Sequence, residues 1–430
     1  MRLIMVIALA TAAVALGFAL GRFTAAPPMF TASESSGDLL ASAFDDFIRA
    51  QQGAIAQYRD SPFFDSDIER AEAYRGFLYA MVSSIKAPAL QSHDHPRFMR
   101  AVDWTSKSGL DNPDNNYYVA MISDQYAYRI TGNRGTTANL VFQLLVGQPG
   151  VAGAGTSTNI SLLYDRDILT DDEGNFEIIV SREKPAGATN WMRNDDDAQT
   201  LLVRYTHADW QTEHDAPLFI EKIGAEGMSA PALSSVEMAA RLRGAAASLY
   251  DRTGTWLDFA NKMWTLAPRN SISPARPTQG GLVGQYSAFG SWEFPEDEAL
   301  VISVAPAGGS YQGIELGNHW FVSLDYETRL TSLTLEQMHC TGERCYAVVA
   351  HRDPGVQNWL DTAGYQRGLI FMRWQGLAGE FPEGAQPEIQ RVSLEELWDV
   401  LPADTPRFTA DERRRQLQAR RAAVHRRFGG

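Results

Sequence analysis

The sequence lacks the short motifs that mark the commonest nucleotide-dependent and zinc-dependent enzymes. It contains no G-x-x-x-x-G-K-[ST] phosphate loop, no G-x-G-x-x-G turn after a predicted strand, no G-x-S-x-G turn around a nucleophilic serine and no H-E-x-x-H helix. Each motif places backbone N–H groups, a nucleophile or metal ligands where the chemistry needs them. Their absence argues against nucleotide-dependent and common zinc-hydrolase reactions, and no organic cofactor is expected.

The sequence is also poor in basic residues. It has 38 Lys and Arg against 52 Asp and Glu, with a formal net charge of −14 and an isoelectric point near 5.1. Because binding to phosphates needs a basic surface, no nucleic-acid partner is expected. The acidic residues are spread along the chain, which is typical of a solvated surface. No metal site is predicted, because His93-Asp94-His95 has no third ligand nearby and the acidic residues from Asp165 to Glu173 lack the spacing of a calcium loop.

Only two cysteines are present. Cys340 and Cys345 flank four residues with turn character and lie between two runs that are typical of strands. A zinc site needs about four ligands, and the sequence has no second cysteine pair. The spacing favours a disulfide that closes a hairpin in an oxidising compartment, and two unpaired buried thiols are the alternative.

The N-terminal region contains a long apolar run. Residues 3–20 carry no charge and follow Arg2. Their number reaches the lower end of a bilayer span, about 17 to 25 residues. Thr24-Ala25-Ala26 would also serve as the cleavage site of a signal peptide, whose apolar region is usually about 7 to 15 residues long. We therefore expect an inner-membrane anchor with the chain facing the periplasm, or a periplasmic protein if the signal is cleaved.

The rest of the chain alternates between helical and β-rich patterns. Apolar residues recur at helical spacing from 38 to 58, and helices are also expected after Ser66-x-x-Glu69 and Ser234-x-x-Glu237. Short runs broken by turns predict an α+β, β-rich fold, with antiparallel sandwich-like or jelly-roll-like portions and helical insertions. The expected regions are a signal peptide or anchor (1–26), a helical region (27–110), a first β-rich portion (111–230), a helical connection (231–280), a second β-rich portion (281–392) and a basic helical tail (393–430).

Several blocks in the second half are recognisable together. They are residues 298–304, 317–326, 329–333 and 351–374. In this order they resemble bacterial proteins that carry the domain of unknown function 1214, which is often preceded by the domain of unknown function 1254. The resemblance covers residues 280–376 closely and extends more loosely back to about residue 110. It implies a β-rich, sandwich-like or jelly-roll-like architecture, and it implies no reaction.

The segment 351–374 also contains a candidate site. Polar and aromatic side chains lie among turn residues between two strand-like runs, as in a binding loop on a rigid scaffold. The alternative is a well-ordered connection whose polar groups satisfy its own backbone.

We expect the turns of this segment to gather its side chains at one end of a sheet. His351 is the candidate for proton transfer, and Asp353 is the carboxylate that would orient it. Arg329 would clamp an anionic or carbonyl group, and Trp359 would form an apolar wall. The other expected members of this cluster are Tyr326, Asn358 and Asp361.

Two further candidates lie outside this loop. Tyr118 and Arg129, near the ends of neighbouring predicted strands, are expected to line a pocket for a hydrophobic molecule with hydroxyl or carboxyl groups, unless they serve packing. Alternation along a predicted strand places His319 and Asp325 on one face. A histidine beside a carboxylate can act as a general base, but the same pairing also satisfies a structural histidine.

These patterns predict an exported, membrane-tethered protein that acts on or binds a hydroxylated or lipid-like small molecule. The alternative is a non-catalytic interaction or assembly protein of the cell envelope. Residues 411–430 contain seven arginines against Asp411 and Glu412, so this tail is expected to bind anionic lipid head groups or to form a solvated helix. An oligomer is compatible with the sequence.

Overall fold

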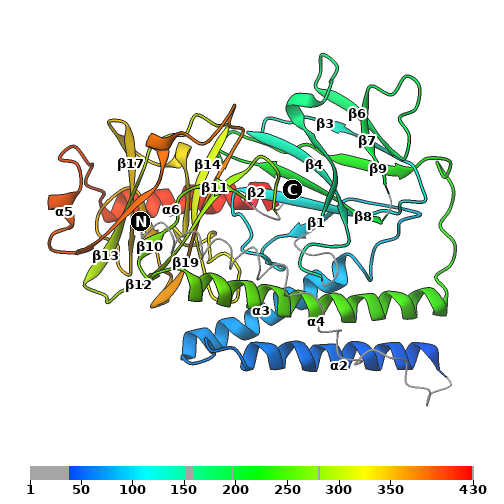
Figure 1. Cartoon of the computed structure of the whole chain (residues 1–430), viewed down its shortest axis with the longest axis horizontal. Coiled ribbons are helices and arrows are strands. Elements are labelled where there is room, and N and C mark those ends of the chain that lie inside the picture. Colours follow the sequence, from blue (N-terminus) through cyan, green and yellow to red (C-terminus); the bar gives the residue numbers. More distant parts are fainter. Residues whose placement is uncertain (1–37, 152–157, 196, 279–280, 429–430) are drawn as a thin grey trace, which may run out of the picture.

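Two β-rich portions stand side by side on a layer of helices (Figure 1). The computed structural model describes residues 38–151, 158–195, 197–278 and 281–428. It confirms the predicted α+β class with mainly antiparallel strands. The predicted signal or anchor over 1–26 lies outside the described residues. Among the residues that are described, no helix combines the length and the apolarity needed to cross a membrane.

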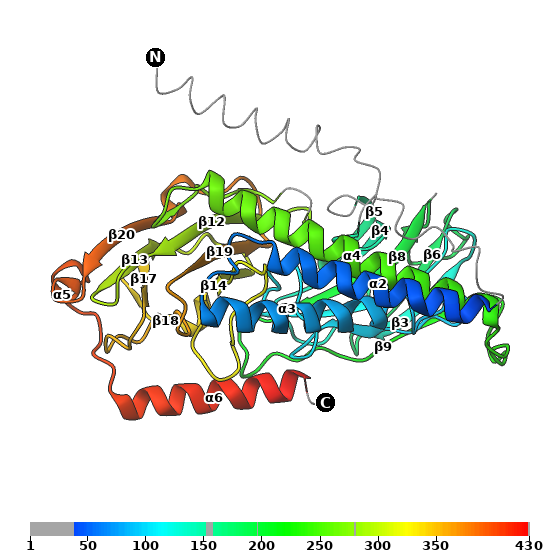
Figure 2. The same cartoon turned by 90° about the horizontal axis from the view of Figure 1, so that it is seen from below.

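The helical layer consists of α2 (Leu39–Arg59), α3 (Asp67–Lys86) and α4 (Ser235–Leu266). Figure 2 looks onto this layer, with the three helices in contact. Each expected helix is confirmed, and Asp38, Ser66 and Ser234 cap their N-termini by accepting backbone N–H groups. Small side chains on α2 and α4 allow the two helices to pack along their length: Ala50, Ala54, Ala245 and Ala246.

The first β-rich portion is a sandwich of two sheets. One has the order β1-β2-β8-β4-β5 and the other β7-β6-β3-β9. Apolar residues from both sheets, such as Phe142, Val203, Ile130 and Ile178, form one core between them. The strands are β1 (Met99–Val102), β2 (Asn115–Met121), β3 (Tyr128–Asn133), β4 (Asn139–Val146), β5 (Asn159–Tyr164), β6 (Asn175–Ser181), β7 (Asn190–Arg193), β8 (Ala198–Thr206) and β9 (Leu218–Lys222).

The second β-rich portion repeats the two-sheet arrangement. One sheet has the order β10-β12-β19-β14-β15 with β11 on β12, and the other β16-β17-β13-β20 with β18 on β17. Trp292, Ile302, Leu316 and Trp374 belong to the core between them. The strands are β10 (Ser271–Ile272), β11 (Arg276–Pro277), β12 (Tyr286–Glu293), β13 (Glu298–Val304), β14 (Tyr311–Gly317), β15 (Ser332–Thr334), β16 (Cys340–Thr341), β17 (Arg344–Ala350), β18 (Trp359–Asp361), β19 (Arg367–Gln375) and β20 (Glu388–Ser393).

The prediction of a strand over residues 317–326 is wrong. Strand β14 ends at Gly317, and the chain turns at once, with a φ of 56° at Phe321. The cause is Asn318, whose side-chain oxygen accepts the backbone N–H groups of Trp320 and Val322 and so favours a turn over a strand ladder. The alternation that placed His319 and Asp325 on one face therefore does not exist.

The tail is a helix that bridges both portions. After α5 (Leu397–Val400), helix α6 (Ala410–Phe428) begins with a reciprocal cap between Thr409 and Glu412. Three of its seven arginines, spaced by two turns, are buried: Arg413, Arg420 and Arg427. Four arginines remain on the outer surface: Arg414, Arg415, Arg421 and Arg426.

The buried Arg420 generates a stability prediction. Its guanidinium donates to the backbone carbonyls of Tyr326 and Ser332 and to the Ser332 hydroxyl, at 2.6 to 3.0 Å. Replacement of Arg420 by alanine should lower the free energy of unfolding by about 3 kcal/mol, because these buried acceptors lose their donor. Urea unfolding followed by tryptophan fluorescence measures the change. Arg414→Ala is the control on the same helix, since Arg414 is 74% exposed and should matter little; equal losses for both variants would contradict the bridging role.

The expected cysteine hairpin is confirmed. Cys340 and Cys345 are opposite one another in the β16–β17 pair, form a disulfide and have Cα atoms 4.0 Å apart. Because a crosslink restricts the unfolded chain, Cys340→Ser with Cys345→Ser should lower the free energy of unfolding by about 2 kcal/mol. Denaturant titrations with and without reductant test this prediction. Reductant should destabilise the wild type and leave the double variant unchanged, and an unaffected wild type would refute it.

Candidate functional site

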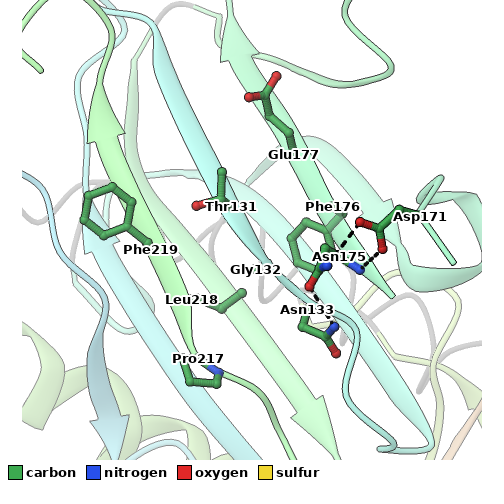
Figure 3. Close-up of a pocket in the computed structure, with 10 residues that line it drawn as sticks. All are labelled: Thr131, Gly132, Asn133, Asp171, Asn175, Phe176, Glu177, Pro217, Leu218 and Phe219. Carbon is green, nitrogen blue, oxygen red and sulfur yellow. Dashed lines mark hydrogen bonds between the residues drawn. The ribbon is translucent and has the colours of Figure 1, made fainter. Parts of the chain in front are cut away.

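A groove lies on the sheet β7-β6-β3-β9 of the first portion (Figure 3). Its volume is about 810 Å³. Three neighbouring strands and the turn before β6 supply its walls, with apolar and polar side chains mixed. The lining residues are Thr131, Gly132, Asn133, Asp171, Asn175, Phe176, Glu177, Pro217, Leu218 and Phe219.

Strand register sets this arrangement. Thr131 on the central strand β3 pairs with Glu177 on β6 and with Phe219 on β9. These three side chains therefore form a row across the sheet, as Figure 3 shows. Two residues further along β3, Asn133 pairs with Asn175 and continues the same face. A Cβ at Gly132, between them, would lie 2.6 Å from a methyl carbon of Leu218 and would displace that side chain.

Hydrogen bonds hold the polar wall in place. Asp171 accepts the backbone N–H groups of Asn175 and Glu173, at 2.8 and 3.0 Å, and the Asn175 amide at 3.1 Å. These bonds, with the Asn175 backbone first, lower the pKa of Asp171, so the carboxylate is charged at neutral pH. The Asn133 amide donates to the Glu173 carbonyl and to the Asn175 side chain. A preformed wall of this kind loses little freedom when a ligand binds.

The groove also offers an apolar surface beside these polar groups. The Phe219 side chain is an exposed aromatic ring, with 58% of the residue accessible to solvent. An aromatic face next to amide and carboxylate groups is suited to a ring that carries hydroxyl groups, since the ring face can stack while the hydroxyls bond.

Arg129, an expected binding residue, adjoins this groove. It lies on the same face of β3 as Thr131, and its guanidinium forms ion pairs with Glu177, Glu221 and Glu226 at 3.1 to 3.3 Å. Tyr118 is elsewhere, on β2, where its hydroxyl donates to Asp215 at 2.7 Å. Burial, followed by the Asp215 charge, raises the pKa of Tyr118. The structure therefore separates Tyr118 and Arg129, which were expected in one pocket.

The loop candidates His351 and Asp353 are not paired with each other. The two ring nitrogens of His351 lie 2.9 Å from the Thr362 hydroxyl and the Phe294 carbonyl, so one nitrogen donates to the carbonyl and the other accepts. Asp353 instead accepts from Arg413 of α6, at 2.9 and 3.2 Å. The prediction that Asp353 orients His351 is wrong, because Arg413 of α6 is a stronger, charged partner for the carboxylate.

The other loop candidates support the surrounding strands. Asn358 donates to the His339 and Tyr346 carbonyls, and the Trp359 indole donates to the Ala350 carbonyl. These contacts match the alternative interpretation, in which the connection satisfies backbone groups.

Arg329 and Asp361 do meet, as expected, at 2.9 Å. Tyr326 is buried in a different neighbourhood, against Trp210 and Lys107. The structure thus divides the cluster expected around the loop into separate contacts.

His319 is enclosed between helices and the second portion. Its ring stacks on Phe63 with centroids 3.9 Å apart, meets the edge of Trp264, and places Nδ1 3.3 Å from a Glu69 oxygen. Glu69 was expected to close a helix cap, and its side chain reaches His319 instead. Burial lowers the pKa of His319, and Glu69 opposes this effect.

This burial predicts a pH dependence of stability. The folded-state pKa of His319 lies below the unfolded value of about 6.5, so the unfolded chain binds the proton more tightly. The stabilisation is complete above pH 6.5 and is lost as the pH falls through that value. His319→Gln should remove this contribution, so the melting-temperature difference between wild type and variant should shrink from pH 8 to pH 5.

Differential scanning fluorimetry across this range measures the effect. His93→Gln, in an exposed turn, is the matched control and should follow the wild type. A constant difference between wild type and His319→Gln would show that the buried ring does not titrate in this way.

Local patterns could not locate the groove. The acidic residues near Asp171 were noted, but β9 was not expected. Thr131, Glu177 and Phe219 are separated by more than 40 residues in sequence, and only the pairing of β3 with β6 and β9 brings them together. The short apolar run Leu218-Phe219-Ile220 was the available signal for that strand.

The fold is α+β, with two sandwich-like portions of mainly antiparallel strands and an open groove on one sheet. The sequence matches no protein-family model and no curated protein. Among solved structures, it resembles an uncharacterised protein from Burkholderia cenocepacia, with a TM-score of 0.76 and 30% identity over 84% of this chain and 99% of that one. A protein from Vibrio parahaemolyticus gives a TM-score of 0.44 and 11% identity over 82% of this chain and 100% of that one. The chain belongs to the same family as the Burkholderia protein. This relationship supports the fold and indicates no activity.

Proposed function

We propose that the protein is a binding protein of the bacterial cell envelope that holds a polyhydroxylated ligand, such as a glycan, in the β3-β6-β9 groove. The observation that carries this proposal is the row of Thr131, Glu177 and Phe219 beside the anchored pair Asn133 and Asn175. These groups supply a stacking ring together with hydrogen-bond donors and acceptors.

Binding rather than turnover is the better match to the chemistry of this face. Asp171 is held ionised by backbone N–H groups, and Glu177 is bound to Arg129. A carboxylate that is held ionised and already hydrogen-bonded, as that of Asp171 is, is suited to accepting ligand hydroxyl groups and less suited to donating a proton as a general acid.

The envelope location rests on the sequence and the disulfide. Residues 3–20 are uncharged and suited to export or anchoring, and the Cys340–Cys345 bond is typical of an oxidising compartment. The tether would hold the groove near the membrane, where envelope glycans are available. We also propose that residues 280–376 form a domain of unknown function 1214. This assignment does not indicate which ligand binds.

The test is a binding assay with Phe219→Ala. Wild-type protein is titrated with a panel of neutral and acidic oligosaccharides by isothermal calorimetry or on a glycan array. Loss of the ring should weaken binding about two- to tenfold, because aromatic contacts of this kind contribute about 0.5–1.5 kcal/mol. Leu169→Ala, an exposed apolar residue that does not line the groove, is the matched control and should bind like the wild type.

Two results would remove the proposal. One is a wild-type protein that binds none of the saccharides. The other is a Phe219→Ala variant that folds normally and keeps full affinity, since the ligand would then bind elsewhere.

A further inference from the structure

A fully buried histidine lies at one end of the first sandwich without a side-chain partner. His207, directly after β8, has no exposed surface, and neither of its ring nitrogens forms a hydrogen bond within the described part of the chain. Its Nε2 atom lies 4.0 Å from a carboxylate oxygen of Asp215, which is longer than a hydrogen bond. Buried polar side chains are nearly always paired, because an unpaired one costs free energy. His207 therefore needs a partner that the described residues do not supply.

Further unpaired groups surround this histidine. Arg427, in the last turn of α6, is 5% exposed and donates to the Pro113 carbonyl at 2.8 Å, but its Nε and Nη1 atoms find no acceptor among the described residues. Arg100 of β1 has an unpaired Nη1 atom, and Asn116 of β2 has an unpaired Oδ1 atom. Six buried polar atoms therefore lack a partner here, two on the histidine, two on Arg427 and one each on Arg100 and Asn116.

These side chains gather around one carboxylate and one backbone carbonyl. Asp215 accepts the Tyr118 hydroxyl at 2.7 Å and the Asn116 amide at 3.0 Å, and it is the carboxylate beside the histidine. The Asn116 amide also lies 3.5 Å from the Arg427 carbonyl, to which Arg100 donates at 2.5 Å. Figure 1 shows the end of α6 beside β2, as these contacts require. The unpaired atoms thus belong to one small region rather than to scattered places.

The unpaired atoms define the chemistry of a missing partner. Burial, and then the charges of Arg427 and Arg100, lower the pKa of His207, so its ring is neutral at neutral pH and has one donor and one acceptor nitrogen. Three guanidinium nitrogens and one ring nitrogen therefore need acceptors. The other ring nitrogen and the Asn116 oxygen need a donor. A partner that satisfies all of them combines an anionic acceptor with a hydroxyl group.

The neighbouring carboxylates of the chain do not fill this role. Asp215 accepts from Tyr118 and Asn116, as described above. Asp114 accepts the Trp210 indole at 2.9 Å and the Tyr311 hydroxyl at 2.6 Å. The unpaired donors of the two arginines are charged, and a charged donor forms its strongest hydrogen bond with an anionic acceptor. That acceptor has to come from outside the described residues.

We propose that these side chains bind a small hydroxycarboxylate, whose carboxylate accepts from Arg427 and Arg100 and whose hydroxyl group donates to Asn116 or His207. A carboxylate matches the planar fork of a guanidinium. With Asp114 and Asp215 close by, one negative charge on the ligand is favoured over the two charges of a phosphate. Arg100 is only half-buried, so it lies on the side from which a ligand reaches the site. None of these side chains lines the β3-β6-β9 groove, and the inference is independent of the proposed function.

The experiment measures the binding of small acids to the full chain in neutral detergent at neutral pH. Lactate is compared with propionate, which lacks the hydroxyl group, with lactamide, which lacks the charge, and with inorganic phosphate. Isothermal calorimetry measures the affinities, and differential scanning fluorimetry measures the melting temperatures. His207→Phe is the main variant, because it removes both unpaired nitrogens and breaks no side-chain hydrogen bond within the described residues. Arg100→Gln is the second variant, and His339→Phe, at an exposed position of the second portion, is the matched control.

Lactate should bind the wild type and the His339→Phe control equally. Propionate should bind about two- to tenfold more weakly, because one hydrogen bond is lost, and lactamide and phosphate should not bind measurably. Without ligand, His207→Phe should melt at or above the temperature of the wild type, because a buried unpaired polar group is gone, and it should not bind lactate. Arg100→Gln should weaken lactate binding by roughly tenfold or more, because a charged donor is lost.

Several results would overturn the proposal. A wild type that binds no lactate would mean that water alone satisfies the buried atoms. Full affinity in the folded variants at positions 207 and 100 would place the ligand elsewhere, and Arg100→Gln decides alone if His207→Phe does not fold. Equal affinity for lactate and propionate would remove the hydroxyl group from the argument, and tight phosphate binding would remove the preference for a single charge. Glycan binding at Phe219 is measured separately and is unaffected by these outcomes.

Discussion

The arginine series on α6 is the constraint that joins the whole molecule. Arg413 binds Asp353 and the Gln357 carbonyl in the second portion, and Arg427 donates to the Pro113 carbonyl beside the first. Between them, Arg420 binds the carbonyls of Tyr326 and of Ser332, the first residue of β15. A spacing of seven residues places all three on one face of the helix. Each bond ends on a backbone carbonyl or a carboxylate far away in sequence, so the tail fixes the relative position of both portions.

Charged groups are buried along the same seam, and hydrogen bonds to fixed partners hold them there. Burial lowers the pKa of Arg420 to about 10, yet the group remains charged at neutral pH. Nearby, Lys107 donates to the Ser323 and Leu324 carbonyls, and Arg373 is bound to Glu315. Buried ion pairs and arginines are expensive to desolvate, so their partners must be in place. An apolar seam would tolerate sliding, whereas these bonds allow one arrangement.

Sequence patterns predicted the parts of the fold that depend on near neighbours. Asp38 and Ser234 begin helices as expected, because a cap needs only the next three residues. The same logic failed where a distant partner competed. The Glu69 side chain contacts His319, 250 residues away. The burial of Arg413, Arg420 and Arg427 could not be predicted, because their acceptors lie outside the tail.

The candidate site follows the same division. Arg129 was recognised from its own strand, but the groove beside it depends on which strands pair with β3. The loop 351–361 attracted attention because its side chains resemble a catalytic set. Its histidine, asparagine and tryptophan instead satisfy backbone and hydroxyl groups, and its Asp353 receives the tail. A dense run of polar and aromatic residues in a long connection is therefore as typical of a loop that stabilises neighbouring strands as of an active site.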